Sequence, residues 1–303
     1  MNGKRRLLVN PAGRRGRIRR HLPRLEEAAA EHGCDLVITQ SGRDIGIQAA
    51  RAVAEGVDRL IVAGGDGTVH LALQPLVYTK TALGILPLGS GNDLATCLGV
   101  PRNLERSLEL AFTAPVWKID VGKIADRYFG GIASLGLDSR VAARAARLRR
   151  IPPSLIYVLA LFLELRHFRC PRLEVEAEGS EFEGEAFFVA FANSTSYGGG
   201  MRLAPGASMA DGLLDLVVVR RMSRLRLLAV FPRVFFGWHV RHPAIAITRV
   251  GGARVTVDPP QPVYGDGEEM IRGEASSVEV ELVPGALRVI AARAVGLPVD
   301  AGA

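Results

Sequence analysis

Residues 61–73 read IVAGGDGTVHLAL, and this stretch decides the fold that we expect. The apolar run at 60–63 predicts a buried parallel strand, which ends at a glycine-rich turn before a new apolar pattern begins. A strand, a glycine turn and a helix N-terminus form an anion-binding arrangement, because the backbone can approach closely and its amides and helix dipole favour negative charge. Asp66 in this turn indicates a Mg²⁺ ion or a hydroxyl beside a phosphate, or else a helix N-cap.

Two further segments have the same organisation. Residues 84–101, GILPLGSGNDLATCLGVP, place a glycine and acid turn after an apolar strand. Residues 7–17, LLVNPAGRRGR, place a glycine and arginine loop after another. Because the carboxyl ends of parallel strands meet at one edge of a doubly wound sheet, the three loops are expected to border one ligand-binding crevice.

The first third of the chain alternates strands and helices. The patterns predict strands over 5–9, 35–39, 58–63 and 83–88. They predict helices over 18–32, 44–55, 68–76 and 103–112. This alternation is typical of βαβ units with a parallel sheet and right-handed crossovers, so we expect an α/β domain over 1–116.

After residue 117 the apolar period changes to two. RLEVEAE at 172–178, AIAIT at 244–248, ARVTVD at 253–258 and SVEVELV at 277–283 alternate apolar with polar or small residues. Period-two strands at short spacing with glycine and proline turns predict an antiparallel β-sandwich over 117–303, whose last residues are expected to pack on the first domain.

Composition restricts the class of protein. A chain of 303 residues, 48% hydrophobic, suits two domains that each bury a core. No apolar run reaches the length of a membrane span, and the three cysteines occur singly, as buried thiols of a reducing cytosol do. The histidines have no zinc-binding spacing. The net charge of +7 is accompanied by no nucleic-acid-binding signature, so we expect no nucleic-acid partner.

Arginines flank two apolar segments. Arg140, Arg144 and Arg147 have helical spacing and Arg149 and Arg150 follow, ahead of the apolar run 156–165, which ends in Arg166, His167 and Arg169. The second segment, 223–243, mixes arginines with Phe231, Phe235, Phe236 and Trp238. Such segments suit an anionic membrane interface, although core helices with solvated arginine rims would have the same pattern.

The motifs of the chain resemble the diacylglycerol kinase catalytic family, which includes bacterial YegS-like lipid kinases, sphingosine kinases and ceramide kinases. The matching segments are NPAG, GGDGT, PLGSGNDLA, SLGLD, APGASMADGLLDL and YGDGEE, in family order between residues 10 and 269. The resemblance implies an α/β nucleotide domain like that of NAD kinase and diacylglycerol kinase, a C-terminal antiparallel β-sandwich domain, and an active site in the cleft between them. It also implies ATP and Mg²⁺ as cofactors.

The resemblance carries the following residues over as nucleotide-binding: Asn10, Pro11, Ala12, Gly13, Arg14, Thr39, Gly64, Gly65, Asp66, Gly67, Thr68, Val69, His70, Ser90, Asn92 and Asp93. Asp66 and Asp93 would hold the Mg²⁺-nucleotide directly or through water, and Asp66 also counts as catalytic. Taken without the resemblance, Asp93 is equally a helix N-cap and Thr39 an ordinary strand-end residue.

Two acidic segments of the second domain complete the implied site. In VYGDGEE, Glu268 is implied as the base that accepts the hydroxyl proton, while Asp266 is a competing base or orients Glu268. Without the resemblance, this segment is a hairpin turn with exposed acids. Asp211, with the backbone carbonyls of Ser208 and Leu213, is implied as a structural Mg²⁺ site, and a β-turn with Asp-Gly at its corner is the alternative.

The chain departs from the family pattern at two places. Gly13 and Arg14 stand where the first loop usually ends in Ser-Gly, and His70 and Leu71 stand where Asn-Glu commonly follows GGDGT. These departures leave open a catalytically weak lipid- or nucleotide-binding regulator, and GGDGT alone would also fit a soluble-substrate kinase like NAD kinase.

The reading that fits all the motifs is an ATP- and Mg²⁺-dependent lipid kinase. It would be cytoplasmic and peripheral to the inner face of the membrane. Its acceptor would be a diacylglycerol-like, phosphatidylglycerol or sphingoid hydroxyl, and the sequence leaves the lipid and a homodimeric assembly open.

Overall fold

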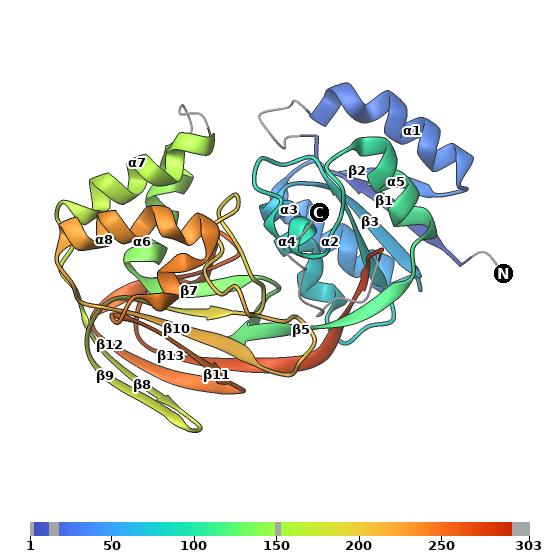
Figure 1. Cartoon of the computed structure of the whole chain (residues 1–303). Helices are drawn as coiled ribbons and strands as arrows, with labels where there is room; N and C mark the ends of the chain where they lie inside the picture. The colour runs from blue at the N-terminus through green and yellow to red at the C-terminus, as the bar shows by residue number, and fades with distance from the viewer. Residues whose placement is uncertain (1–2, 12–17, 149–152, 293–303) are drawn as a thin grey trace. The chain divides into compact units, whose positions relative to one another are not determined.

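A computed structural model describes residues 3–11, 18–148 and 153–292 (Figure 1). The chain divides into two compact units, unit 1 with Met1–Asp120 and Pro284–Ala303, and unit 2 with Val121–Val283. The division differs from the predicted boundary at residue 116, because strands β5 (Val116–Ile124) and β13 (Glu268–Ile290) each belong partly to both units. The end of β13, predicted as part of the second domain, therefore lies in unit 1.

Unit 1 contains a parallel sheet. Its strand order is β2 (Asp35–Ile38), β1 (Arg5–Val9), β3 (Arg59–Gly64), β4 (Ala82–Pro87) and the end of β13, and all neighbours are parallel. The four strands predicted here from apolar runs are thus confirmed, with ends displaced by one residue at most.

Five α-helices accompany this sheet in the described part of unit 1: α1 (Leu22–Glu31), α2 (Gly42–Ala54), α3 (Asp66–Leu73), α4 (Asp93–Cys97) and α5 (Leu104–Thr113). The helix predicted over 18–32 begins later, with Pro23 in its first turn, where a missing N–H costs nothing. The helix predicted to reach residue 76 becomes 3₁₀ over Gln74–Leu76, because Pro75 has no N–H to continue the α-helical bonds.

Alternate strand residues of unit 1 face opposite sides of the sheet. Leu7, Val9, Ile61 and Ala63 are buried in one cluster with residues of α1 and α5. Leu8, Leu60 and Val62 are also fully buried and point to the other side, where α2 and α3 lie in Figure 1. Helices on both faces of a parallel sheet make unit 1 a doubly wound α/β domain.

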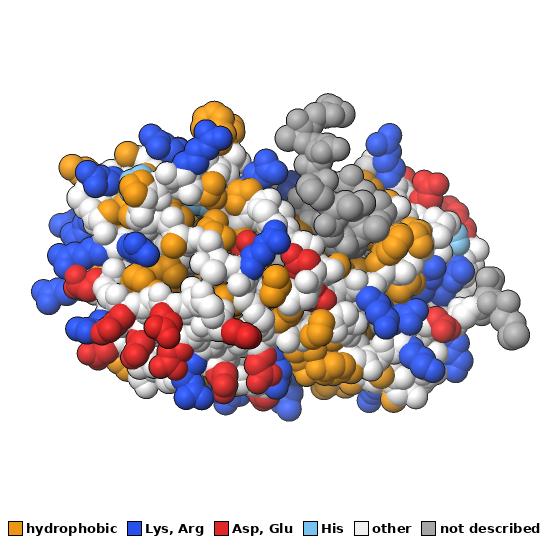
Figure 2. All heavy atoms as spheres, turned by 60° about the horizontal axis from the view of Figure 1, so that its bottom comes forward, with side chains coloured by type: hydrophobic (Ala, Val, Ile, Leu, Met, Phe, Trp, Pro, Cys, Tyr) orange, Lys and Arg blue, Asp and Glu red, His pale blue; other side chains and the backbone are white. Residues whose placement is uncertain are grey.

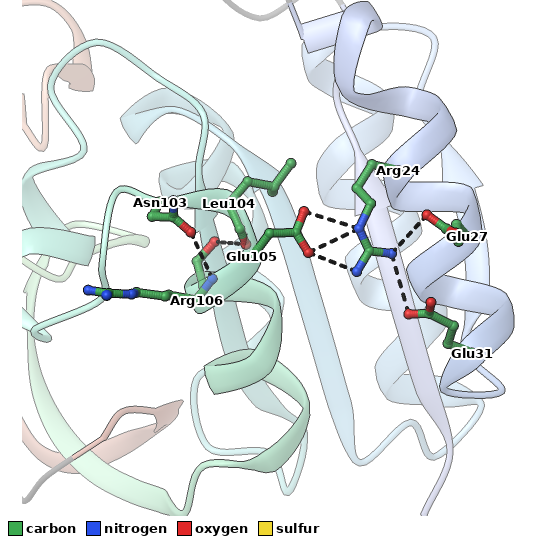
Figure 3. A network of polar contacts seen from close by, with 8 residues as sticks. Arg24, Glu27, Glu31, Asn103, Leu104, Glu105 and Arg106 are labelled. Atoms are coloured by element: carbon green, nitrogen blue, oxygen red, sulfur yellow. Dashed lines mark hydrogen bonds and ion pairs between the residues drawn. The ribbon is translucent and has the colours of Figure 1, made fainter.

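An arginine on α1 connects that helix to α5 (Figure 3). Arg24 donates from Nε and Nη2 to the Glu105 carboxylate, at 2.8 Å for the Nη2–Oε2 pair, and from Nη1 to Glu27 and Glu31 at 3.2 and 3.3 Å. The hydrogen bonds that Arg24 donates to Glu105 and Glu31 raise the pKa of Arg24 despite its partial desolvation. At the start of α5 the Asn103 side chain caps the helix by accepting from the Arg106 N–H.

Unit 2 contains mainly antiparallel strands. They are β6 (Arg127–Phe129), β7 (Ile132–Gly136), β8 (Arg172–Ala177), β9 (Ser180–Ala192), β10 (Leu214–Arg220), β11 (Ile245–Val250), β12 (Gly252–Gly265) and the start of β13. The long strands β9 and β12 each pair with β8 through their first halves and with β7 through their second halves. This change of partner folds the sheet into two layers around a core (Figure 1).

The two-residue period places side chains into two separate cores. Leu216 and Val218 of β10 lie in the core between the sheet layers, whereas Val217 and Val219 lie in a second core under helices. Those helices are α6 (Leu137–Arg147), α7 (Pro153–Leu165) and α8 (Arg224–Val230), followed by the 3₁₀ segments η3 (Phe231–Phe236) and η4 (Trp238–Arg241). Unit 2 thus has helices, a sheet layer and a second sheet layer, in that order.

The arginine-flanked apolar segments form this helical layer. Leu161, Leu165, Leu227 and Val234 are buried in its core, as a core-helix interpretation requires. Other apolar residues of the same segments are exposed. On α6, Arg140 is paired with Glu274 and Arg144 with Glu164, while Arg149 and Arg150 lie outside the described residues. No helix of the described chain is long and apolar enough to span a membrane.

Candidate functional site

Three loops meet in unit 1 at the carboxyl ends of adjacent strands. Asn10 follows β1, and its Nδ2 donates to the Thr68 hydroxyl at 3.0 Å. Thr68 lies on α3, directly after the glycine turn that follows β3. This bond joins the first loop to the second, as expected for loops at the carboxyl edge of one sheet.

Asp66 joins the second loop to the third. One carboxylate oxygen of Asp66 accepts from the Asn92 N–H at 2.8 Å, and the other accepts from the Asp93 N–H at 2.6 Å. Both donors belong to the start of α4, whose first amides have no partner within the helix. The carboxylate is therefore a clamp between two phosphate-loop candidates, a role that the sequence alone did not indicate.

Glycines allow the second and third loops to approach each other. A Cβ on Gly89 would stand 2.4 Å from the Cα of Gly65, and a Cβ on Gly91 would stand 2.6 Å from the nearer Asp66 carboxylate oxygen. Asn92 is in the left-handed region with φ 58°, and its side-chain amide exchanges two hydrogen bonds with the backbone of Gly89. The two loops therefore pack backbone against backbone.

The carboxylates of Asp66 and Asp93 border the same glycine. The Cβ position of Gly91 lies 2.6 Å from an Asp66 oxygen and 3.4 Å from an Asp93 oxygen. Both side chains are partly exposed. Two carboxylates at this proximity fit a hydrated divalent cation, since Mg²⁺ is commonly held by one or two carboxylates and water.

The remaining predicted nucleotide-binding residues have varied surroundings. The Thr39 hydroxyl is buried and donates to the Val9 carbonyl at 3.1 Å, which ties β2 to β1. Val69 and His70 are buried in α3, whereas Ser90 is exposed. Gly64 is buried, and Gly67 and Pro11 are partly exposed. Three of the predicted residues lie outside the described chain: Ala12, Gly13 and Arg14.

In unit 2 the turn between β12 and β13 carries Asp266 and Glu268. Asp266 has φ 54°, and its carboxylate accepts hydrogen bonds from the amides of Gly130 and Gly131 at 2.8 Å and of Ile132 at 3.2 Å. A Cβ on Gly131 would stand 2.7 Å from that carboxylate. Asp266 therefore fixes the turn to the residues between β6 and β7.

Glu268 begins β13, directly after this fixed turn. It is half-buried, and its backbone pairs with Gly265 across the hairpin. Within the described chain its carboxylate has no hydrogen bond or ion pair, in contrast to that of Asp266. Of the two acids, Glu268 is the one whose oxygens are available to accept a proton.

A polar cluster that the sequence analysis did not assign lies at the start of α6. The Asp138 carboxylate accepts from the Ser134 hydroxyl at 2.6 Å and from the Tyr197 hydroxyl at 2.7 Å. Burial raises the pKa of Asp138, although both hydrogen bonds oppose this shift. The motif SLGLD contains two of these residues, but Tyr197 is too distant in sequence for any pattern to pair with them.

The predicted metal ligands lie in the long loop between β9 and β10. Asp211 Oδ1 accepts from the Leu213 N–H at 3.2 Å across Gly212, whose φ is 77°, and its Oδ2 is 3.9 Å from Arg249 Nη1. Burial raises the pKa of Asp215, which Arg249 opposes. A carboxylate with neighbouring carbonyls is a donor set of the type Mg²⁺ takes. The same contacts also form an Asx turn, so the metal role stays a prediction.

Comparisons with known proteins agree with the motifs. The diacylglycerol kinase catalytic domain matches residues 4–124, and the YegS C-terminal NAD kinase β-sandwich-like domain matches residues 131–291. A protein named diacylglycerol kinase from Mycobacterium tuberculosis (strain CDC 1551 / Oshkosh) is 37% identical over 251 residues, 80% of each chain. One of the same name from Staphylococcus aureus (strain MRSA252) is 28% identical over 277 residues, 88% of this chain and 87% of the relative.

The solved structures support the fold. A chain described as a diacylglycerol kinase from Bacillus anthracis superposes with a TM-score of 0.76 at 23% identity, covering 95% of this chain and 97% of that one. At this identity the likeness is one of fold alone.

Proposed function

Because the chain belongs to the diacylglycerol kinase family, we propose that it is an ATP- and Mg²⁺-dependent lipid kinase that transfers the γ-phosphate to a lipid hydroxyl. The observation that carries this proposal is the Asp66 clamp, which joins two glycine loops at the carboxyl edge of a parallel sheet. A diacylglycerol is the first acceptor to test, because these relatives are named diacylglycerol kinase.

Nucleotide binding is assigned to the loops of unit 1. Phosphoryl transfer needs positioning and charge neutralisation more than covalent chemistry, so loops held in fixed positions are well suited to it. Asp66 and Asp93 would hold Mg²⁺ through water beside Gly91. The ion, when bound, neutralises charge on the phosphates. Asn10 and Thr68, which bond to each other, would line the same site. Thr39 would contribute less to nucleotide binding, because its hydroxyl already donates to the Val9 carbonyl.

Proton acceptance is assigned to Glu268. As the lipid hydroxyl oxygen forms its bond to the γ-phosphorus, Glu268 takes the hydroxyl proton, and the bond from phosphorus to the oxygen shared with the β-phosphate breaks to leave ADP. Three amides already bind the Asp266 carboxylate, so we assign it the positioning of the turn that bears Glu268. The product is the lipid phosphate, which remains in the bilayer.

The structural Mg²⁺ site at Asp211, with the carbonyls of Ser208 and Leu213, remains part of the proposal. Its test is thermal unfolding of the purified protein with Mg²⁺ and with chelator. The wild-type melting temperature should rise with Mg²⁺, and that of Asp211→Asn should rise less. A rise of equal size in both proteins would contradict the assignment.

Labelled phosphate transfer from ATP into diacylglycerol in detergent micelles tests the activity. We expect transfer by the wild type, a loss of at least about 100-fold in Glu268→Gln, because general-base catalysis supplies that much, and near-wild-type transfer in Glu269→Gln. Glu269 is a matched control, since it is the adjacent acid of the same hairpin and is exposed. NAD replaces the lipid in a parallel reaction. Transfer to NAD but not to any lipid, or full activity in Glu268→Gln, would overturn the proposal.

A further inference from the structure

Exposed apolar side chains are concentrated on one part of unit 2. Of the eleven large hydrophobic side chains that are exposed in the described chain, eight belong to α7, α8, η3 and η4. We call them the apolar face, and they are Leu159, Phe162, Leu163, Leu225, Phe235, Phe236, Trp238 and Val240. Leu225 is 81% exposed, Phe236 62% and Trp238 61%. A concentration of this kind marks an interaction surface, whereas single exposed residues do not.

The apolar face is held outward by a rigid base. Beneath η3 and η4, Val234 is buried and His239 is 3% exposed, with its Nε2 2.9 Å from the Leu203 carbonyl. Between these residues Gly237 has φ 72°, and a Cβ there would stand 2.8 Å from Pro205. The rings of Phe236 and Trp238 stack at 5.1 Å. Because Val234 and His239 are buried, they hold the segment in place and leave the Phe236 and Trp238 rings exposed.

The charge around the apolar face has one sign. Residues 223–243, which contain α8, η3 and η4, include four arginines and no Asp or Glu. Exposed Arg226, Arg233 and Arg241 form no ion pair within the described chain. Arg224 donates to the carbonyls of Arg166 and Phe168 at 3.0 and 2.9 Å, which links the start of α8 to the end of α7. The face thus combines aromatic side chains with uncompensated cations.

The opposite side of unit 2 carries the other sign. A groove on the second sheet layer, formed by β8, β9, β12 and β13, is bordered by Arg254 and by seven glutamates: Glu174, Glu176, Glu178, Glu181, Glu183, Glu279 and Glu281. Three of them, Glu183, Glu279 and Glu281, are paired with cations, and the other four form no ion pair within the described residues. Figure 2 shows acidic side chains gathered on this layer. The helical layer lies on the far side of both cores from these acids. Unit 2 is therefore electrostatically polar across its layers.

We infer that unit 2 docks on an anionic bilayer surface through the apolar face, with Phe236 and Trp238 at headgroup depth and the glutamate layer turned to water. Aromatic rings partition to the bilayer interface, and arginines beside them are attracted by anionic lipid headgroups. A second copy of the chain fits worse, because a two-fold contact would place uncompensated arginines against one another. The biological purpose of this docking rests on the proposed lipid kinase activity. The observations that support the docking itself do not depend on that activity.

The test uses vesicle sedimentation without nucleotide, with phosphatidylcholine alone or with 30% phosphatidylglycerol. We expect binding to the anionic vesicles and much weaker binding to the neutral ones. Arg233→Gln and Arg241→Gln should each weaken binding about fivefold, and added salt should weaken it further. Phe236→Ser should weaken it about tenfold. Ile47→Ser, an exposed apolar residue of α2, and Arg254→Gln, on the sheet layer, are matched controls whose affinity should equal the wild type.

Tryptophan fluorescence gives an independent readout. The chain has two tryptophans, so Trp117→Phe leaves Trp238 as the single reporter. Its emission should shift to the blue on anionic vesicles and be quenched by bromine-labelled acyl chains. Urea unfolding of each variant establishes that it is folded.

Three results would overturn the docking: equal binding to both vesicle types, unchanged binding in the Phe236 and Arg233 variants, or a dimer in sedimentation that these variants dissociate. The protein could bind vesicles through the apolar face and yet transfer no phosphate. That result would overturn the proposed kinase activity and leave the docking intact.

Discussion

The Asp66 clamp should contribute measurably to the stability of unit 1. Its carboxylate accepts two main-chain hydrogen bonds, at 2.8 and 2.6 Å. A hydrogen bond to a charged group is worth about 1.5–3 kcal/mol, and we take about 1.5 kcal/mol for each because the site is partly exposed, or about 3 kcal/mol for both. Asp66→Asn should lower the free energy of unfolding at least as much as Asp66→Ala. The Asn side-chain NH₂ would face a main-chain N–H donor, whereas in the Ala variant water can accept both main-chain hydrogen bonds.

Urea unfolding followed by fluorescence measures this loss. Trp117 lies in unit 1 and donates from Nε1 to the Ala291 carbonyl at 3.1 Å, so in a Trp238→Phe background it reports on unit 1 alone. With a denaturant slope of about 1.5 kcal/mol per molar, the midpoint should fall by about 2 M. Glu109→Gln is the matched control, because Glu109 is an exposed acid of the same unit.

A midpoint of Asp66→Asn within about 0.3 M of the wild type would refute the clamp. A smaller loss of stability in Asp66→Asn than in Asp66→Ala would also refute the clamp. That order is expected if the Asp66 carboxylate serves only to bind a cation and accepts no main-chain hydrogen bonds.

Three other predictions concern stability. Gly89→Ala places a methyl group 2.4 Å from the Gly65 Cα, so the unfolding free energy should fall by about 2 kcal/mol in urea titration; a change under about 0.5 kcal/mol would contradict the backbone contact. Burial raises the pKa of Asp138 in the folded protein, so stability should fall as pH rises from about 4 through that pKa, and Asp138→Asn should flatten this decline in titrations at several pH values. Burial lowers the pKa of His239, so stability should fall as pH drops from about 6.5 through the folded pKa, and His239→Gln should remove that loss; an unchanged acid limb would contradict it.

Local patterns were sufficient to predict most elements. The parallel strands of unit 1 are short apolar runs that end in glycine turns, and a run of this kind has few alternatives in a βα alternation. The period-two segments of unit 2 were equally clear, because glutamates alternate with buried residues along β8. Motif resemblance then supplied the order of the loops and the family.

Contacts between distant residues could not be predicted. Asp66 was expected at a phosphate or a metal, and its bonds to Asn92 and Asp93 follow only from the approach of two glycine loops. Tyr197 reaches Asp138 from a loop far along the chain, and no periodicity encodes that pairing. The sequence predicts a strand over 277–283 alone, because period-two alternation ends there, whereas β13 continues through Pro284 and Gly285 into unit 1.

The end of β13 has a consequence for how the protein is made. Val289 pairs with Leu83 at the outer side of β4, Ile290 covers Gly84, and the Gly285 N–H donates to Asp120. During synthesis β4 therefore emerges long before the strand that covers its edge, and an uncovered edge invites pairing with other chains. The unit 1 segment that is made first must wait for the whole of unit 2 to be translated, so a ribosome stalled before residue 284 should carry a segment that recruits chaperones.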